Sequence, residues 1–175
     1  CGLAARDSLR AGAVLPLSHQ DIGPWPFINN PWSFALPFND DQTGFTKKFT
    51  GDEALINIEE PGYTYPFAGF DLRKVSPGDS TVVTDSGDVE IGVVLTCVTD
   101  MAIGRIDEKI YSITSPDRPD EFNPKGLSCG FVKVTKKLSG GDTVKLNDGR
   151  RTIKVVIVDD IRPDRTARRA IKNML

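Results

Sequence analysis

The stretch VEIGVVLTCVT, from Val89 to Thr99, is rich in β-branched and apolar residues, which is typical of a β-strand. Five other stretches have the same texture, and turn residues separate them. The six predicted strands are Phe67 to Leu72, Ser80 to Thr84, Val89 to Thr99, Leu127 to Thr135, Asp142 to Leu146 and Thr152 to Val158. Short strands at this spacing predict a closed or sandwiched β-domain.

Two of the connections between these strands have the composition of hairpin turns. They are Asp85 to Asp88 and Asn147 to Gly149, and the second contains the Asp-Gly step that tight hairpins favour. The longest connection, Asp100 to Gly126, begins with a part that suits a strand or a helical turn and continues as a charged loop with prolines. A lid, a partner surface and a tolerated insertion all remain open for this loop.

A polar turn at Glu59 to Tyr65, with a Pro-Gly step, separates the strands from a different texture upstream. We place a domain boundary there, which divides the chain into residues 1–61 and 62–175. Within the first part, Phe45 to Ile58 starts irregularly and then predicts a short helix, with Thr50 or Asp52 as its N-cap.

The first residues, GLAARDSLR from Gly2 to Arg10, predict a helix that places Arg6 and Arg10 on one side. Asp7 lies three residues before Arg10 and can pair with it, but one acid cannot neutralise both arginines. Surface arginines with buried stems are one interpretation. The other is that one arginine anchors an anion or a heteroaromatic ring, because a guanidinium group is planar and always charged.

The segment Ser18 to Pro31 holds three prolines and a glycine, which predicts a shaped loop. His19, the single histidine, lies near Asp21, and a carboxylate partner could tune it for acid or base work. A histidine with only local hydrogen bonds is the alternative. Trp25, Phe27 and Trp32 could form a flat wall for a planar ligand, or could simply plug the loop onto the core. A short strand is predicted just after them, at Ser33 to Phe38.

The tail from Asp164 to Leu175 has the pattern of an amphipathic helix with Asp164 as its cap. Its apolar stripe is Ala167, Ile171 and Leu175, and its other side is basic. A basic helix can bind membranes or nucleic acid, but the net charge of −2 favours docking on the protein itself. We expect neither a nucleic-acid nor a membrane partner.

The composition is that of an ordinary globular protein, with 39% apolar and 26% charged residues in a chain of 175. The early Arg6 and Asp7 do not suit a signal peptide, so we expect a cytoplasmic protein. Three cysteines and one histidine predict no metal site, and Cys97 and Cys129 lie in strand-like surroundings that favour buried thiols over nucleophiles. Because Cys1 begins inside a motif, we expect a fragment, an isolated domain or one subunit of a split enzyme.

Two motifs carry a family resemblance. GLAARDSLR, followed by a hydrophobic turn and HQDI, resembles G-L-x-A-R-D-x-L-R-L-E-A-G-x-x-L-Y-G-x-D-I of the glycine cleavage T-protein (aminomethyltransferase) superfamily. The superfamily pattern F-x-G-x-x-A-L is matched further on by Phe49, Gly51, Ala54 and Leu55. Members of this superfamily pass one-carbon units to tetrahydrofolate.

The resemblance implies that the chain is the C-terminal half of such a protein. The expected fold class is α+β, mostly β: the end of an α/β folate-binding body, a six-stranded antiparallel β-barrel and a terminal helix. Tetrahydrofolate is the implied cofactor, with Arg6 near its pterin and Arg10, Trp25 and Trp32 as further contacts. His19 and Asp21 would lie at the pocket.

The superfamily's catalytic aspartate and its pterin-gripping acid belong to the N-terminal half, so the resemblance implies a missing region or a partner subunit. Three departures favour a divergent, demethylase-like branch acting on a small methyl or aminomethyl donor. The family's glutamate after L-R-L is lost at Gly12, its second folate-site arginine would fall near Gly78, and Leu95-Thr96-Cys97 replaces T-S-G. The alternative is a non-catalytic β-barrel binding or regulatory subunit on the same scaffold.

Overall fold

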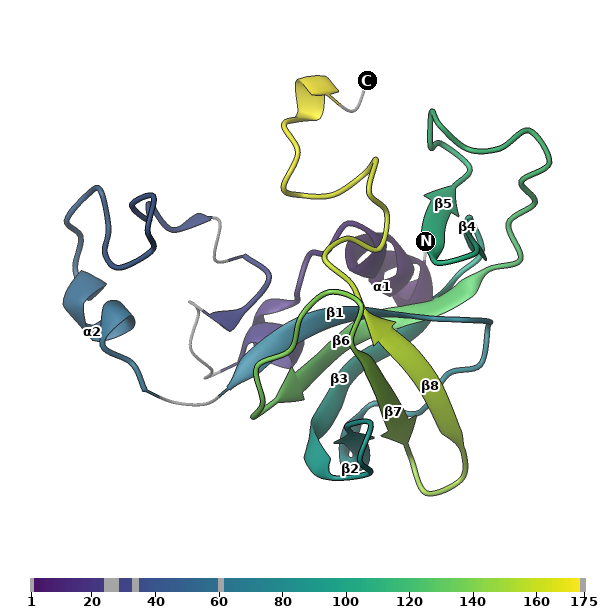
Figure 1. The fold of residues 1–175 in the computed structure, drawn as a ribbon, viewed down its shortest axis with the longest axis horizontal. Helices are drawn as coiled ribbons and strands as arrows, with labels where there is room; N and C mark the ends of the chain where they lie inside the picture. Colours follow the sequence, from purple (N-terminus) through teal and green to yellow (C-terminus); the bar gives the residue numbers. More distant parts are fainter. Residues whose placement is uncertain (1, 24–28, 33–34, 60–61, 174–175) are drawn as a thin grey trace.

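The computed structural model describes residues 2–23, 29–32, 35–59 and 62–173. Six antiparallel strands close into a barrel in the order β1-β6-β3-β2-β7-β8 (Figure 1). They are β1 (Tyr63–Gly69), β2 (Gly78–Thr84), β3 (Glu90–Asp100), β6 (Leu127–Val134), β7 (Thr143–Asn147) and β8 (Thr152–Ile157). The predicted barrel is therefore confirmed, and each predicted strand overlaps an observed one.

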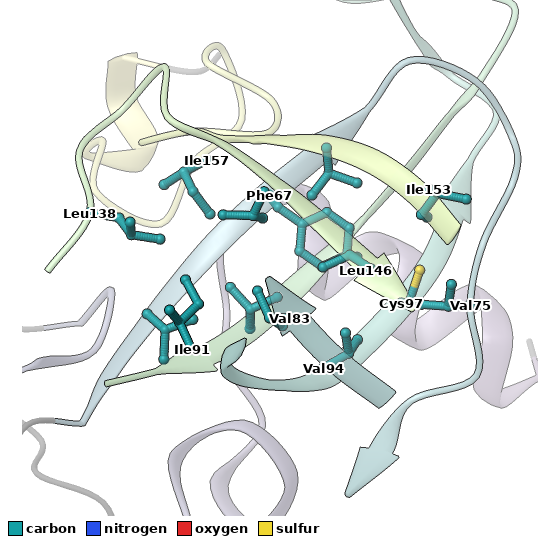
Figure 2. Packing of buried hydrophobic residues seen from close by; sticks show 14 residues of the cluster. Phe67, Val75, Val83, Ile91, Val94, Cys97, Leu138, Leu146, Ile153 and Ile157 are labelled. Atoms are coloured by element: carbon teal, nitrogen blue, oxygen red, sulfur yellow. The ribbon is translucent and has the colours of Figure 1, made fainter. Parts of the chain in front are cut away.

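The barrel closes where its first and last strands meet. In that pairing Phe67 lies opposite Ile157, and on the other side of β1 Phe67 lies opposite Gly130 of β6. Alternate side chains point inward from all six strands and fill the barrel (Figure 2). Phe67 and Leu146 are fully buried there, so the interior is a packed core.

A second core lies on the outer face of β3 and β6, where helix α1 (Leu3–Gly12) packs. Ala11 of α1 and the following Val14 are buried with Phe131 of β6. Strand β6 is consequently covered on both faces, with Phe131 in the outer core and Val132 in the barrel core. The last turn of α1 is thus fixed to the barrel, whereas residues 2–6 are exposed.

The long connection after β3 begins as a two-stranded hairpin, β4 (Ile103–Ile106) and β5 (Lys109–Ser112). This agrees with the strand alternative for its first half. The hairpin is tied to the C-terminal tail, because Asp164 accepts hydrogen bonds from the hydroxyl groups of Ser112, Thr114 and Ser115.

The amphipathic α-helix predicted for the tail is wrong for the described residues, which contain a single 3-10 turn, η4 (Ile171–Asn173). Tertiary contacts override the helical pattern here. Asp164 is bound by hydroxyl groups instead of capping a helix, and the Ala167 N–H donates to the carbonyl oxygen of Ala13 over 2.9 Å. Ile171, from the expected apolar stripe, is 76% exposed.

Residues 35–59 form a lobe beside the barrel (Figure 1). Three tilted phenylalanine rings pack within it: Phe45 lies 4.9 Å from Phe38 and 5.0 Å from Phe49 between ring centroids. The predicted short helix is α2 (Asp52–Ile56), but Gly51, in the left-handed region, occupies its N-cap position in place of Thr50 or Asp52. The predicted strand at 33–38 is reduced, within its described residues, to one bridge between Phe38 and Phe45.

Among the helices described, none is long and apolar enough to cross a membrane.

Candidate functional site

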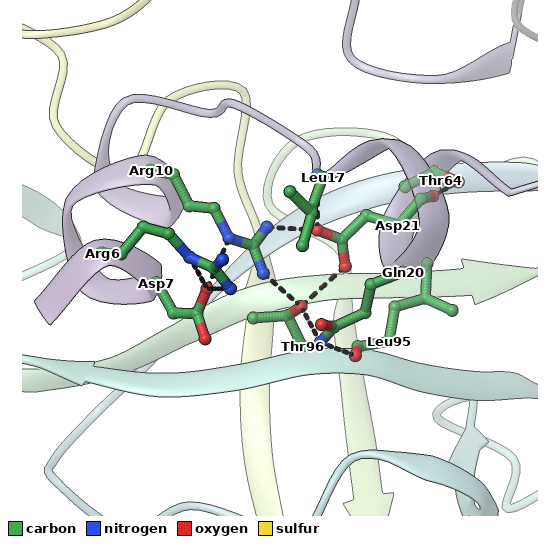
Figure 3. Close-up of polar contacts among 9 residues, drawn as sticks. All are labelled: Arg6, Asp7, Arg10, Leu17, Gln20, Asp21, Thr64, Leu95 and Thr96. Carbon is green, nitrogen blue, oxygen red and sulfur yellow. Dashed lines mark hydrogen bonds and ion pairs between the residues drawn. The ribbon is translucent and has the colours of Figure 1, made fainter. Parts of the chain in front are cut away.

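Arg10, in the last turn of α1, is the centre of a buried polar network (Figure 3). Its Nε donates to Asp7 over 2.8 Å, its Nη1 forms an ion pair with Asp21, and its Nη2 donates to the Thr96 hydroxyl over 3.1 Å. Only 8% of the Arg10 side chain is exposed, and Asp21 is fully buried. The cation is therefore compensated by two acids inside the protein.

Asp21 is positioned by η1 (Ser18–Ile22), a single π-helical turn that the proline-rich loop begins with. The Leu17 N–H donates to one Asp21 carboxylate oxygen over 2.8 Å, and the Thr96 hydroxyl donates to the other over 2.6 Å. The neighbouring Gln20 donates from Nε2 to the Leu95 carbonyl oxygen over 2.9 Å. The turn and the barrel wall thus hold the carboxylate from both sides.

Thr96 reaches this network because β3 has a bulge. Val94 lies opposite Val132 and Thr96 opposite Phe131, which leaves Leu95 as an extra residue. A bulge turns the side chains beside it toward a different face of the sheet. Sequence reasoning missed this role of Thr96, because a bulge leaves no clear pattern in a run such as Val93 to Cys97.

Arg6 has very different surroundings from Arg10. Half of its side chain is exposed, and it donates from Nη2 to the same Asp7 oxygen over 3.1 Å. Partial burial opposes ionisation of Asp7, but hydrogen bonds from Arg10 and Arg6 outweigh it and hold the pKa of Asp7 below its usual value. The predicted pair between Asp7 and Arg10 is present, and Asp21 is the second acid that two arginines require.

The other predicted site residues are scattered around this loop. His19 is exposed, and in the described part of the chain no contact joins it to Asp21, whose carboxylate is bound by Arg10, Leu17 and Thr96. Trp25 and Phe27 lie outside the described residues. Trp32 is half-buried, and its buried indole N–H has no hydrogen-bond partner within the described part of the chain.

A cavity of about 550 Å³ opens between this loop, the start of β1 and the segment after β8. The Thr64 hydroxyl, on its wall, points to the Asp21 carbonyl oxygen at 3.5 Å and so connects the cavity with the Arg10 network. The lining residues include Asn29, Asn30, Tyr63, Tyr65, Lys137 and Arg168. Most of these are polar or aromatic, which suits a flat polar ligand.

Two features of the cavity wall were not predicted from the sequence. The rings of Tyr63 and Tyr65 lie nearly parallel, with centroids 6.0 Å apart, and burial raises the pKa of Tyr65. Asn30 is 6% exposed, and its Oδ1 accepts from the Trp32 backbone N–H, yet its Nδ2 has no hydrogen-bond partner among the described residues. The alternation of Tyr63 and Tyr65 was a usable signal, whereas an unpartnered amide is visible only in three dimensions.

Cys97 and Cys129 are free and buried, as predicted, in the barrel core and the outer core respectively. Burial raises the pKa of the Cys97 thiol to about 11 and raises that of Cys129 further. Neither is a nucleophile near neutral pH. Within the described residues, no group of three or more histidine, cysteine or acidic side chains is placed to hold a metal ion.

Comparison with solved structures identifies a similar fold. The fold of this chain resembles that of an aminomethyltransferase T. The similar structure, glycine cleavage system aminomethyltransferase T from Bartonella henselae, superposes with a TM-score of 0.56 and 22% sequence identity over 90% of this chain. The chain spans 37% of the length of that protein. No family model and no curated protein sequence matches the chain.

The likeness confirms, at the level of fold, the resemblance that the two motifs indicated.

Proposed function

We propose that the chain is part of a tetrahydrofolate-dependent one-carbon transferase of a demethylase-like branch, with a methyl or aminomethyl donor as its substrate. The cavity beside the Arg10 network carries the proposal. It has room for a bicyclic ring, and Asn30 of its wall carries a buried Nδ2 with no hydrogen-bond partner among the described residues. A pterin ring presents nitrogen and carbonyl acceptors along its edge, so an unpaired donor in a flat polar cavity fits it.

The two arginines of α1 take different parts in this proposal. Three of the nitrogen atoms of Arg10 donate within the protein, so Arg10 is a positioning residue that fixes α1 and the loop. Arg6 is half-exposed and pairs with Asp7, and it is not among the residues that line the cavity, so it would meet a part of the ligand that extends beyond the cavity. Trp32 follows Pro31 of the cavity wall and would contact the ring, whereas Trp25, His19 and Asp21 stay predicted contacts.

The residues that perform the chemistry would come from elsewhere. The chain spans 37% of the similar protein, and the remaining part of that fold has no counterpart here. Helix α1 also exposes two large apolar side chains, Leu3 at 72% and Leu9 at 60%. Exposed leucines on a helix whose buried residues are Arg10, Ala11 and Gly12 are suited to contact another part of a protein. A partner polypeptide, or a further region of the same chain, would supply the catalytic aspartate.

The chain's own contribution would then be binding and orientation. Tetrahydrofolate supplies the nitrogen that receives the one-carbon unit. Such a nitrogen is a poor nucleophile toward a methyl ether or amine, so the two reactants must be held in line. The Arg10 network fixes the loop and α1 against the barrel, which keeps the proposed cofactor contacts in one arrangement.

Calorimetric titration with tetrahydrofolate tests the proposal, with the chain alone and with a candidate partner that carries the remaining part of the fold. We expect tetrahydrofolate to bind in at least one of these two settings. We expect Asn30→Ala and Arg6→Met each to weaken this binding at least fivefold. Lys145→Met is the matched control, because Lys145 is also part-exposed, pairs with a nearby aspartate and lines neither cavity. Absence of binding in both settings would disprove the function, and an Arg6→Met change without effect would disprove the assignment of Arg6.

The self-contained Arg10 network favours one second candidate, a non-catalytic barrel subunit. The charge of Arg10 is neutralised by Asp7 and Asp21 and needs no ligand, so the scaffold could bind a partner without a cofactor. Association with the partner but not with tetrahydrofolate, in the same titrations, identifies this case.

A further inference from the structure

A second hollow, of about 490 Å³, lies at the opposite end of β1 from the cavity described above. Its wall is formed by the segment that follows β1, by Lys125 and Gly126 before β6, and by Arg151 before β8. None of these residues belongs to the Arg10 network. The hollow is therefore a separate feature of the barrel, at its other rim.

One part of the wall of this hollow is apolar, and charged side chains form the rest. Phe70 is 48% exposed and Leu72 is 40% exposed, both unusually open for large apolar side chains in so short a segment. Gly126 lets the chain pass close to Leu72: it has a φ of +78°, and a Cβ there would lie 2.6 Å from Leu72 and 3.1 Å from Met101. An exposed group of this kind, in a concave site, suits an apolar ligand.

Arg105 packs against the Phe70 ring of this hollow. The Arg105 guanidinium lies over the Phe70 ring, 5.0 Å from its centroid, in a cation–π contact. Its Nη1 donates to the Glu108 carbonyl oxygen, but Nε and Nη2 are buried and no described residue accepts a hydrogen bond from them. Burial lowers the pKa of Arg105, as expected for a cation with too little compensation.

The charges around the hollow are unbalanced. The pair between Arg73 and Asp71 neutralises itself, whereas no ion pair of the described residues involves Lys125 or Arg151. Asp148 lies within electrostatic reach of Arg151, but its carboxylate accepts three backbone N–H groups. Two cations therefore face an apolar wall without a dedicated counter-charge.

We propose that this hollow binds a small organic carboxylate with an aromatic body. The ring would lie against Phe70 and Leu72, and the carboxylate would pair with Lys125 and Arg151. Such a ligand satisfies both halves of the site, because its apolar part leaves water while its charge meets the unpaired cations. This inference goes beyond the proposed folate function and does not rest on it.

Phenylacetate is a suitable probe, with phenylacetamide as the uncharged match. Titration of the ¹⁵N-labelled chain, followed by NMR, should give saturable shifts centred on residues 70–73, 125–126 and 151. Lys125→Gln and Arg151→Gln should each weaken binding of phenylacetate at least fivefold, and Phe70→Ala should do the same. Lys48→Gln, an exposed lysine in the lobe of residues 35–59, should leave binding unchanged.

All of these side chains are exposed, so the variants should keep the fold. The dispersion of the NMR spectrum shows whether each variant is folded. Equal binding of phenylacetamide would overturn the charge half of the proposal, and shifts centred elsewhere would overturn the site. Tetrahydrofolate is absent from this experiment, so its outcome is independent of the proposed function.

Discussion

Two arginines four residues apart in α1 show how burial decides what a side chain does. Arg10 is 8% exposed and meets two carboxylates, whereas Arg6 is half-exposed and shares one of them. Removing one partner of a buried pair leaves the other as an uncompensated charge, and this is far more costly than losing an exposed pair. The two residues should therefore respond very differently to the same substitution.

We expect Arg10→Met to lower the free energy of unfolding by about 3 to 5 kcal/mol, because Asp21 would remain buried without its cation. Arg6→Met should change it by about 1 kcal/mol or less. Urea unfolding of both variants measures the difference. Equal effects of the two substitutions would contradict the assigned roles.

Adding Asp21→Leu to Arg10→Met should restore part of the lost stability, because the second substitution removes the stranded carboxylate. The double variant should therefore unfold at a higher urea concentration than Arg10→Met alone. A double variant as unstable as the sum of the two single variants would show that the residues act independently.

The thiols give a second test at this scale. In a Cys1→Ser background, we expect Cys97 and Cys129 to be unreactive toward a disulfide reagent at pH 8 in the folded protein. Both should react at once in guanidinium chloride, which is the internal control. Rapid reaction of either thiol in the folded protein would show that its core opens readily.

Among the elements, the tail is held by contacts that a helical pattern does not reveal. Asp164 binds three hydroxyl groups of the segment at β5, and Arg162 forms a bidentate pair with Asp100 at 2.6 Å for each hydrogen bond. Burial opposes ionisation of Asp164, but the hydrogen bonds outweigh it and lower its pKa. The tail is thus fixed by a carboxylate that must be ionised.

This lowered pKa predicts a pH dependence. A carboxylate with a lower pKa in the folded state stabilises above its unfolded value, near 4, and the effect is lost as pH falls through the folded value. Asp164→Asn should therefore reduce stability at pH 7 and make little difference well below pH 4. Urea unfolding of the variant and the wild type between pH 3 and pH 7 checks this. A difference that grew toward low pH would contradict it.

Strand β6 depends on a glycine where it passes close to β3. A Cβ at Gly130 would lie 1.9 Å from the Thr96 carbonyl oxygen, a backbone atom that cannot turn aside. Gly130→Ala should cost more than about 2 kcal/mol of stability, as overpacked core sites do. Gly44→Ala is the control, since its nearest atom lies 3.6 Å away. Similar thermal unfolding midpoints for both variants would disprove the close approach.

The strands could be predicted because β-branched residues and turn signals report local conformation directly. The conformation of the tail could not be predicted, because Ala167 and Asp164 satisfy the helical pattern but bind partners from residues 13 and 112–115. The same limit applies to the site. The pair between Asp7 and Arg10 is local and was predicted, whereas Asp21 and Thr96 join it only after the chain has folded.

For the whole molecule, the barrel core and the outer core share strands β3 and β6. Phe67 lies in the first and is fully buried, and Phe70, three residues later, lies outside and is half-exposed. We expect Phe67→Ala to cost about 3 to 5 kcal/mol, as large-to-small changes in packed cores do. Phe70→Ala should cost much less. Calorimetric melting of the two variants measures the contrast, and a Phe67→Ala protein of nearly wild-type stability would contradict a filled barrel.

The pairing of β1 with β8 has a consequence for how the protein is made. Phe67 finds its partner Ile157 only 90 residues further along the chain. While the ribosome is still synthesising the intervening residues, β1 has β6 on one side at most, and its other edge stays open to any strand nearby. A nascent chain that stalls before residue 152 would therefore expose an unpaired edge of β1, which favours aggregation.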